Sequence, residues 1–322
     1  MIRFFGDNRP LVLFFLPLVI LGFHLAYHIS ITPSGPMDLD FGWWGNSTIK
    51  QGRTFLSYEF YAGLWVAINA MLLSFTFNSG EFNDKITYLP ALIFVMLSAL
   101  TKGFFQFDGV HLSTTMLILS FYQFNQLNQN QDGAARVFNA GFFLGIASSV
   151  YPPLILMLPF GVLYYLTYRP FTFREFLLYS IGASTPFIYL ISHTIFFDLE
   201  WPTFHFDLND YIRHFQLEEG INTAIFLTLY VIGLIGIWVK LSVGGNRQKK
   251  ELQLVNNYGI GILISLIFCA FISVPPLKIE LFIFPLSILF TYPLLSKSLN
   301  FSASLIFYIL FFFGLFKYFL LN

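Results

Sequence analysis

Long apolar stretches recur along almost the whole chain, and short polar stretches separate them. A helix needs about 20 apolar residues to cross the ~30 Å hydrocarbon core of a bilayer. By this criterion the pattern predicts an all-α, polytopic transmembrane helical bundle with about 11 spans, in a range of 10–12. The predicted spans lie near residues 11–31, 59–77, 87–105, 110–126, 137–151, 153–168, 174–196, 221–241, 256–274, 278–296 and 302–321.

The stretch 137–168 predicts a broken helical hairpin, because Tyr151-Pro152-Pro153 interrupts continuous apolar sequence. Proline cannot continue a helix. The first arm of the hairpin, residues 137–151, spans only about 22 Å at 1.5 Å per residue. We therefore expect a recessed apex that forms the floor of an outward-opening cavity above Ser148, Ser149 and Tyr151. The segment 273–277 repeats the Ser-Val and Pro-Pro pattern at a second turn. Two ordinary hairpins with turn prolines are the alternative.

Composition strengthens the membrane prediction, with 56% hydrophobic, 20% aromatic and 11% charged residues in a chain of 322. Soluble domains carry roughly 25% charged residues. The loops are short, so we expect a single integral membrane domain over 1–322. The 17 basic and 17 acidic residues balance, which gives no indication of a nucleic-acid partner. The first apolar stretch lacks a small-residue cleavage site, so it is predicted to be a retained span.

The distribution of basic residues predicts a cytoplasmic N-terminus. If the spans alternate from there, eleven of the 17 Lys and Arg residues fall on the inner side, with the densest group at 240–250. Two large loops, 32–58 and 197–220, then lie outside. Both loops mix acidic with aromatic residues.

The first external loop carries the most suggestive chemistry, because Asp38 and Asp40 are followed closely by Trp43 and Trp44. A carboxylate can act as a general base, and an indole face can stack on a sugar ring. We therefore assign Asp38 and Asp40 as candidate catalytic residues and the two tryptophans as candidate substrate contacts. Turn formation by Asp and interfacial placement of Trp remain the structural alternatives.

Basic residues are scarce on the predicted outer side, so Lys50, Arg53 and Arg213 are candidate clamps for a phosphate or pyrophosphate group. Tyr151, at the hairpin apex, is a further candidate substrate contact. Snorkelling of the basic side chains to the membrane interface is the alternative. The acidic and histidine residues of the second loop fit no specific metal-ligand motif, we assign no metal-binding residue, and the sequence leaves the cofactor unknown.

His24 and His28 are four residues apart in the first span and therefore share one helical face. This spacing suits a metal ion, a quinone-like head group or simple interfacial packing. The sequence leaves these three interpretations open.

Several of these features together resemble the C-type integral membrane glycosyltransferases, which take sugars from polyprenyl-phosphate donors. The shared features are the acidic first loop with Asp38 and Asp40, then Gly141, Gly145, Tyr151-Pro152-Pro153, the apolar stretch 154–166 and Arg169. The resemblance covers roughly the first two hundred residues. It implies Asp38 or Asp40 as the base or acceptor-orienting acid, with an outward cavity for a lipid phosphate. The acids here lie several residues into the loop, and no soluble C-terminal domain follows.

The chain as a whole is also similar to small, uncharacterised bacterial polytopic membrane proteins, a resemblance that implies no function. The function predicted is that of a glycosyltransferase-like enzyme that acts on a polyprenyl-phosphate-linked substrate at the outer leaflet of a bacterial inner membrane. A non-catalytic subunit or scaffold of an envelope complex and a transporter of lipid or small solutes are the alternatives. The expected partners are membrane lipid, a polyprenyl-phosphate lipid and, for a subunit, other membrane proteins.

Overall fold

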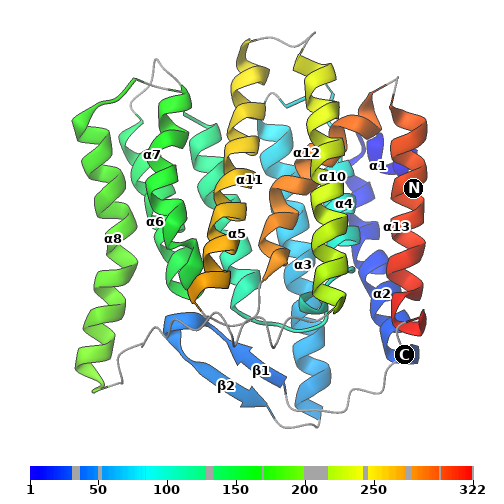
Figure 1. Ribbon diagram of the computed structural model, residues 1–322, viewed down its shortest axis with the longest axis horizontal. Coiled ribbons are helices and arrows are strands. Elements are labelled where there is room, and N and C mark those ends of the chain that lie inside the picture. Colours follow the sequence, from blue (N-terminus) through cyan, green and yellow to red (C-terminus); the bar gives the residue numbers. More distant parts are fainter. Residues whose placement is uncertain are drawn as a thin grey trace.

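The protein is a bundle of helices that lie side by side, with a small β-hairpin at one end (Figure 1). This computed structural model describes residues 1–30, 37–49, 53–80, 82–83, 85–127, 133–168, 170–198, 217–241, 246–272, 278–296 and 299–320. We call the end of the bundle that carries the strands the hairpin end.

The elements follow one another along the chain with few long interruptions. The first half contains α1 (Ile2–Gly6), η1 (Pro10–Phe15), α2 (Leu16–Ser30), β1 (Met37–Asp40), η2 (Gly42–Trp44), β2 (Asn46–Ile49), α3 (Arg53–Ser79), α4 (Leu89–Ser98), η3 (Lys102–Phe104), α5 (Gly109–Asn125) and α6 (Ala134–Val150). The second half contains η4 (Pro152–Leu156), α7 (Met157–Tyr168), α8 (Phe173–Phe196), α10 (Leu217–Leu241), α11 (Asn246–Ile272), η5 (Ile279–Phe282), α12 (Ile283–Leu295) and α13 (Asn300–Leu320).

The helical character predicted from the apolar stretches is confirmed, and every predicted span overlaps a helix. Among the described residues, four helices are long and apolar enough to cross a membrane: Pro10–Ile29, Glu59–Ser79, Gly220–Val239 and Asn300–Lys317. The number of about 11 spans therefore stays a prediction. Two short strands, β1 and β2, are an addition that the all-α prediction did not contain.

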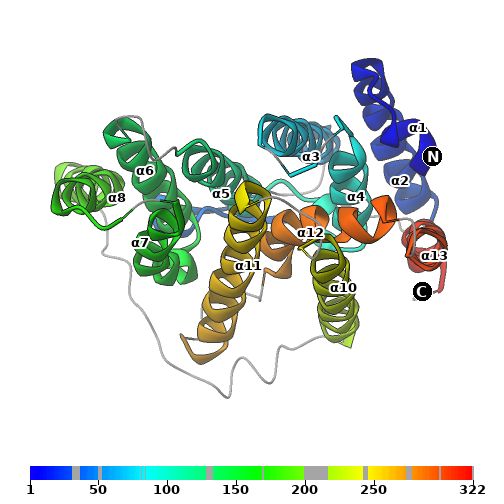
Figure 2. The ribbon, with the colours of Figure 1, turned by 90° about the horizontal axis from the view of Figure 1, so that it is seen from above.

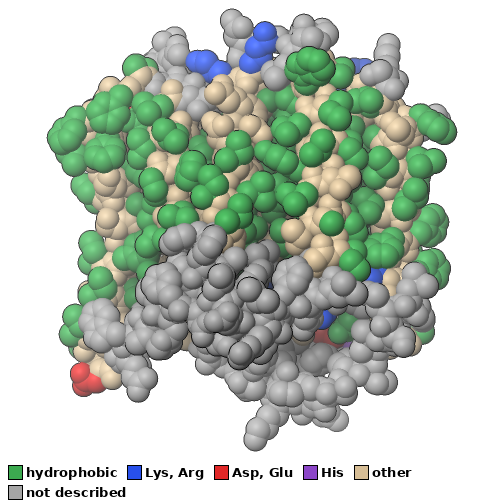
Figure 3. All heavy atoms as spheres, in the orientation of Figure 1, with side chains coloured by type: hydrophobic (Ala, Val, Ile, Leu, Met, Phe, Trp, Pro, Cys, Tyr) green, Lys and Arg blue, Asp and Glu red, His purple; other side chains and the backbone are tan. Residues whose placement is uncertain are grey.

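Apolar side chains are spread over the helices on the face of the bundle that Figure 3 shows, and many large hydrophobic residues are exposed. Trp238 on α10 is 77% exposed and Phe301 on α13 is 83% exposed. Monomeric soluble proteins rarely present contiguous apolar surface on this scale. The surface is therefore compatible with an apolar solvent such as the hydrocarbon of a bilayer.

Two short helices, α4 and α12, occupy the interior of the bundle. With 10 and 13 residues, they span about 15 and 20 Å at 1.5 Å per residue, less than the hydrocarbon thickness. All ten residues of α4 are buried, and Figure 2 shows α12 between α4, α10 and α11. The sequence predicted a helix through 87–105, but α4 ends at Ser98 and is followed by irregular chain and η3.

Helices α6 and α8 pack closely because glycines lie where they cross. A Cβ atom on Gly182 of α8 would collide with the carbonyl oxygen of Phe138 on α6. On α6, a Cβ on Gly141 or Gly145 would collide with backbone oxygens of α8. Small residues that let helix backbones approach are the usual device for helix association in membranes.

Basic side chains are visible at the end of the bundle opposite the hairpin end (Figure 3). Lys249 and Lys250 lie in the first turns of α11, and Arg136 and Arg174 lie in the first turns of α6 and α8. This grouping agrees with the side that the sequence assigns to the cytoplasm. The orientation in a membrane stays a prediction.

Candidate functional site

The broken helical hairpin predicted from the double proline is present, and it consists of α6, η4 and α7. Its apex lies at the end of the bundle that carries the β-hairpin. Helix α6 ends at Val150, and Tyr151 takes an extended conformation with φ −127° and ψ 93°, as expected for a residue before proline. The apex is buried, and the Ser148 hydroxyl lies 2.8 Å from the carbonyl oxygen of Leu144 and 3.0 Å from that of Leu154. The Ser148 hydroxyl thus connects the last turns of α6 with the η4 turn that follows the break.

The β-hairpin covers this apex. Its strands pair antiparallel, with Asp38 opposite Thr48 and Asp40 opposite Asn46. Between the strands, Gly42 and Gly45 have φ values of 60° and 115°, which favour glycine. A Cβ atom on Gly42 would also collide with the carbonyl oxygen of Val150. The turn can therefore approach the end of α6 only because position 42 carries no side chain.

Aromatic side chains dock the β-hairpin onto two neighbouring helices, α6 and α8. The indole N–H of Trp44 donates to Ser149 Oγ at 3.0 Å. The Trp44 ring stacks on Tyr189 of α8 with centroids 5.8 Å apart, and Trp43 meets Phe187 edge-on at 5.4 Å. These contacts connect the acidic loop, the hairpin apex and α8, which the sequence could not place together.

A groove of about 540 Å³ lies under the docked hairpin, between α5, α6 and α8. Its lining is almost entirely apolar and consists of Phe41, Trp44, Leu112, Phe142, Ile146, Val150, Thr185, Pro186 and Tyr189. Two of these residues, Trp44 and Tyr189, are 43% and 61% exposed, so the groove opens at the surface of the bundle. We call this the roofed groove; its walls suit a hydrocarbon chain and not a sugar or a phosphate.

The structure places the predicted site residues unequally around the roofed groove. Trp44 lines it, Trp43 packs beside it on Phe187, and Tyr151 is buried at the apex next to it. Asp38 and Asp40 belong to the roof by their backbone, and Arg53 begins α3; the side chains of these three lie outside what the structure describes. Lys50 and Arg213 lie wholly outside the described residues.

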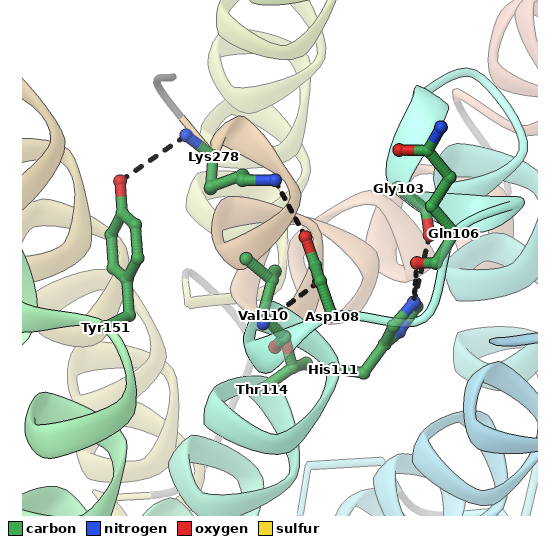
Figure 4. Close-up of polar contacts among 8 residues, drawn as sticks. All are labelled: Gly103, Gln106, Asp108, Val110, His111, Thr114, Tyr151 and Lys278. Carbon is green, nitrogen blue, oxygen red and sulfur yellow. Dashed lines mark hydrogen bonds and ion pairs between the residues drawn. The ribbon is translucent and has the colours of Figure 1, made fainter. Parts of the chain in front are cut away.

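A buried polar cluster that the sequence did not predict lies beside the apex (Figure 4). Asp108 caps the N-terminus of α5, with the Val110 N–H donating to Oδ1 at 3.0 Å. Its other oxygen accepts a hydrogen bond from Lys278 Nζ at 2.7 Å. The Lys278 backbone N–H points to the Tyr151 hydroxyl at 3.5 Å. This ion pair therefore connects α5, the start of η5 and the broken hairpin.

His111 and Glu280 extend the cluster into the interior. His111 Nε2 lies 2.9 Å from the carbonyl oxygen of Gly103 and 3.0 Å from that of Gln106, in the irregular chain between α4 and α5. Glu280 is buried against Gly103, and its Oε2 has no hydrogen-bond partner among the described residues. A cavity of about 20 Å³ between them has room for about one water molecule.

The polar cluster escaped the sequence because its members are distant along the chain and lie close to predicted span ends. Asp108 and Lys278 are 170 positions apart. Lys317 is a similar case, since it lies near the end of the last predicted span, yet it is buried and donates to the Leu100 carbonyl oxygen at 2.5 Å. An available signal was the rarity of charged residues in apolar sequence, which makes each one a candidate functional or structural group.

Comparison of the chain with protein-family models, with curated proteins and with solved structures finds no match. The site must therefore be interpreted from its own geometry. An apolar groove open to the bundle surface can hold a lipid chain. The β-hairpin above the groove contains Asp38 and Asp40. The Asp108–Lys278 ion pair holds the neighbouring segments together.

Proposed function

We propose that this chain is an integral membrane protein that binds a lipid-linked substrate with the lipid chain in the roofed groove. The observation that carries the proposal is the docking of the acidic hairpin over that groove through Trp44 and Ser149. Ligand pockets usually measure about 300–1,000 Å³, and the groove falls in this range. The side chains of the β-hairpin above the groove then decide which reaction the protein supports.

The reaction that fits these parts best is glycosyl transfer from a polyprenyl-phosphate-linked sugar at the outer leaflet of a bacterial inner membrane. An acceptor hydroxyl would attack the anomeric carbon as its bond to the phosphate oxygen breaks. Asp38 or Asp40 would take the hydroxyl proton, and polyprenyl phosphate would leave. Lys50, Arg53 and Arg213 are the proposed phosphate contacts, and the face of Trp43 or Trp44 the proposed sugar contact.

Lipid selectivity in such a site would come from shape and not from burial alone. A polyprenyl chain that enters the groove leaves hydrocarbon of equal apolarity, so burial of its surface adds little free energy. The width between α6 and α8, set by Gly141, Gly145 and Gly182, therefore decides which chains fit.

The Asp38→Asn and Asp40→Asn double variant is expected to lose transfer activity by about a hundredfold or more, the usual effect of a lost general base. The measurement is transfer of radiolabelled sugar from undecaprenyl-phosphate glucose to acceptors in membranes that contain the protein. Asp198→Asn is the matched control, because Asp198 follows α8 at the same end and is exposed. Full transfer by the double variant at equal membrane abundance would contradict the proposal and favour the scaffold hypothesis.

A transporter is the second candidate, and the buried polar cluster favours it. Irregular chain with charged groups inside a bundle, between η3 and α5, is typical of discontinuous helices in transporters. Proton uptake by proteoliposomes would distinguish the two functions, if uptake occurs with wild type and disappears when Asp108→Asn and Lys278→Met are combined.

A further inference from the structure

A second groove, of about 390 Å³, lies between α2 and α3. Figure 2 places these helices far from α8 and hence from the roofed groove. Its apolar lining consists of Pro17, Ile20, Leu21, Phe60, Gly63, Leu64 and Ala67. Leu21 and Leu64 are also exposed on the bundle surface, so the groove is accessible from the surrounding lipid. We call it the α2–α3 groove.

Three polar side chains also line the α2–α3 groove: His24, His28 and Glu59. His28 Nε2 lies 2.5 Å from Glu59 Oε2, and this polar contact joins the two helices. The remaining Glu59 oxygen, Oε1, and His24 Nε2 are buried and have no hydrogen-bond partner among the described residues. Buried polar atoms normally have partners, and an unpaired one costs about 1–3 kcal/mol.

The arrangement favours a neutral ligand with one oxygen that donates a hydrogen bond and a second oxygen that accepts one. Glu59 can accept from a hydroxyl, and His24 can donate to a hydroxyl or carbonyl oxygen, so the two hydroxyls of a quinol match both groups and a carbonyl of a quinone matches His24. A carboxylate head group only accepts hydrogen bonds and an ammonium head group only donates them, so neither matches both side chains. A modest rotation of the imidazole or the carboxylate about its terminal torsion, which is soft, presents these atoms to the groove.

Aromatic side chains hold His24 in place, and one, Phe60, lines the groove, where a flat ring can pack against it. The His24 ring stacks on Phe104 with centroids 5.0 Å apart and meets Phe105 edge-on at 5.1 Å. Phe60 forms part of the opposite wall on α3. Within the described residues no group of three His, Cys, Asp or Glu is arranged to hold a metal ion. The polar side chains of the groove are therefore considered as hydrogen-bonding groups.

We propose that the α2–α3 groove binds a neutral lipid of the quinone and quinol class, with the ring between His24 and Glu59 and the tail along Leu21 and Leu64. The proposal concerns binding alone and involves no electron transfer. It is independent of the function proposed for the roofed groove, because the two grooves share no lining residue.

The test measures binding of decylubiquinone and decylubiquinol to the purified full-length protein in nanodiscs by equilibrium dialysis. Leu64→Trp should fill the groove and weaken binding at least about tenfold without altering the polar residues, and Glu59→Gln should weaken decylubiquinol binding by about tenfold. Leu18→Trp is the matched control, since Leu18 is exposed on α2 but does not line the groove. It should bind like wild type.

Two charged probes complete the experiment. Palmitate and dodecylamine should bind at least about tenfold more weakly than decylubiquinol, because neither head group can both donate a hydrogen bond to Glu59 and accept one from His24. Absence of decylubiquinone and decylubiquinol binding to wild type would overturn the proposal. Equal binding by Leu64→Trp, or equal binding of the charged probes, would overturn it as well.

Discussion

Replacement of Lys278 by methionine is expected to lower the free energy of unfolding by about 2–3 kcal/mol, because it leaves the Asp108 carboxylate buried without its cation. Loss of one partner from a fully buried pair costs about 3–5 kcal/mol. The Lys278 side chain keeps 20% of its exposure, which reduces this cost. Reversible unfolding in bicelles, followed by circular dichroism, would measure the change.

Two further variants separate the charge effect from general damage. Lys249→Met removes an exposed lysine at the opposite end of the bundle and should leave stability unchanged. Asp108→Asn added to Lys278→Met removes the unpaired charge, while asparagine keeps the ability to cap α5. The double variant should therefore be more stable than Lys278→Met alone. If Lys278→Met were as stable as Lys249→Met, the ion pair would have no structural role.

Replacement of Gly182 by leucine is expected to separate α6 from α8 and to destabilise the protein by about 3 kcal/mol or more. Even single extra methylenes in packed interiors cost about 1–3 kcal/mol, and here a Cβ already collides with the Phe138 carbonyl oxygen. The roofed groove should be lost together with the packing, because α6 and α8 form its walls. Unfolding in bicelles again provides the measurement.

Ser184→Leu is the control for this prediction, since Ser184 is exposed on the outer face of the same helix. Its hydroxyl donates only within α8, to the Ser180 carbonyl oxygen. A leucine there should face the surrounding lipid at little cost. Equal stability of Gly182→Leu and Ser184→Leu would show that the α6–α8 contact is not as close as described.

Much of the helical arrangement followed from local sequence. Each apolar stretch that predicted a span overlaps a helix in the structure, and Pro152-Pro153 predicted the break in the helical hairpin. Both signals are local, because helix length is set by hydrocarbon thickness and a proline removes a backbone donor wherever it lies. The early end of α4 carried no comparable proline signal and was missed.

The site depended on contacts between distant segments, and local signals do not specify these. Nothing in the acidic loop indicates that Trp44 bonds Ser149 on α6, 105 positions later. The two strands were missed because Gly42 and Gly45 mark a tight turn only once the partner strand is known. The pairing of Glu59 with His28 likewise needed the packing of α3 against α2.

The most direct test of the central claim is photocrosslinking of the protein with an undecaprenyl phosphate analogue that carries a diazirine in its chain. We expect crosslinks on the lining residues of α6 and α8, such as Phe142 and Tyr189. Ile146→Trp, which fills the roofed groove, should reduce their yield about tenfold, while Ile188→Trp on the exposed face of α8 should not. Crosslinks spread evenly over the exposed helix faces, and unchanged by Ile146→Trp, would contradict the proposal that the roofed groove holds a lipid-linked substrate.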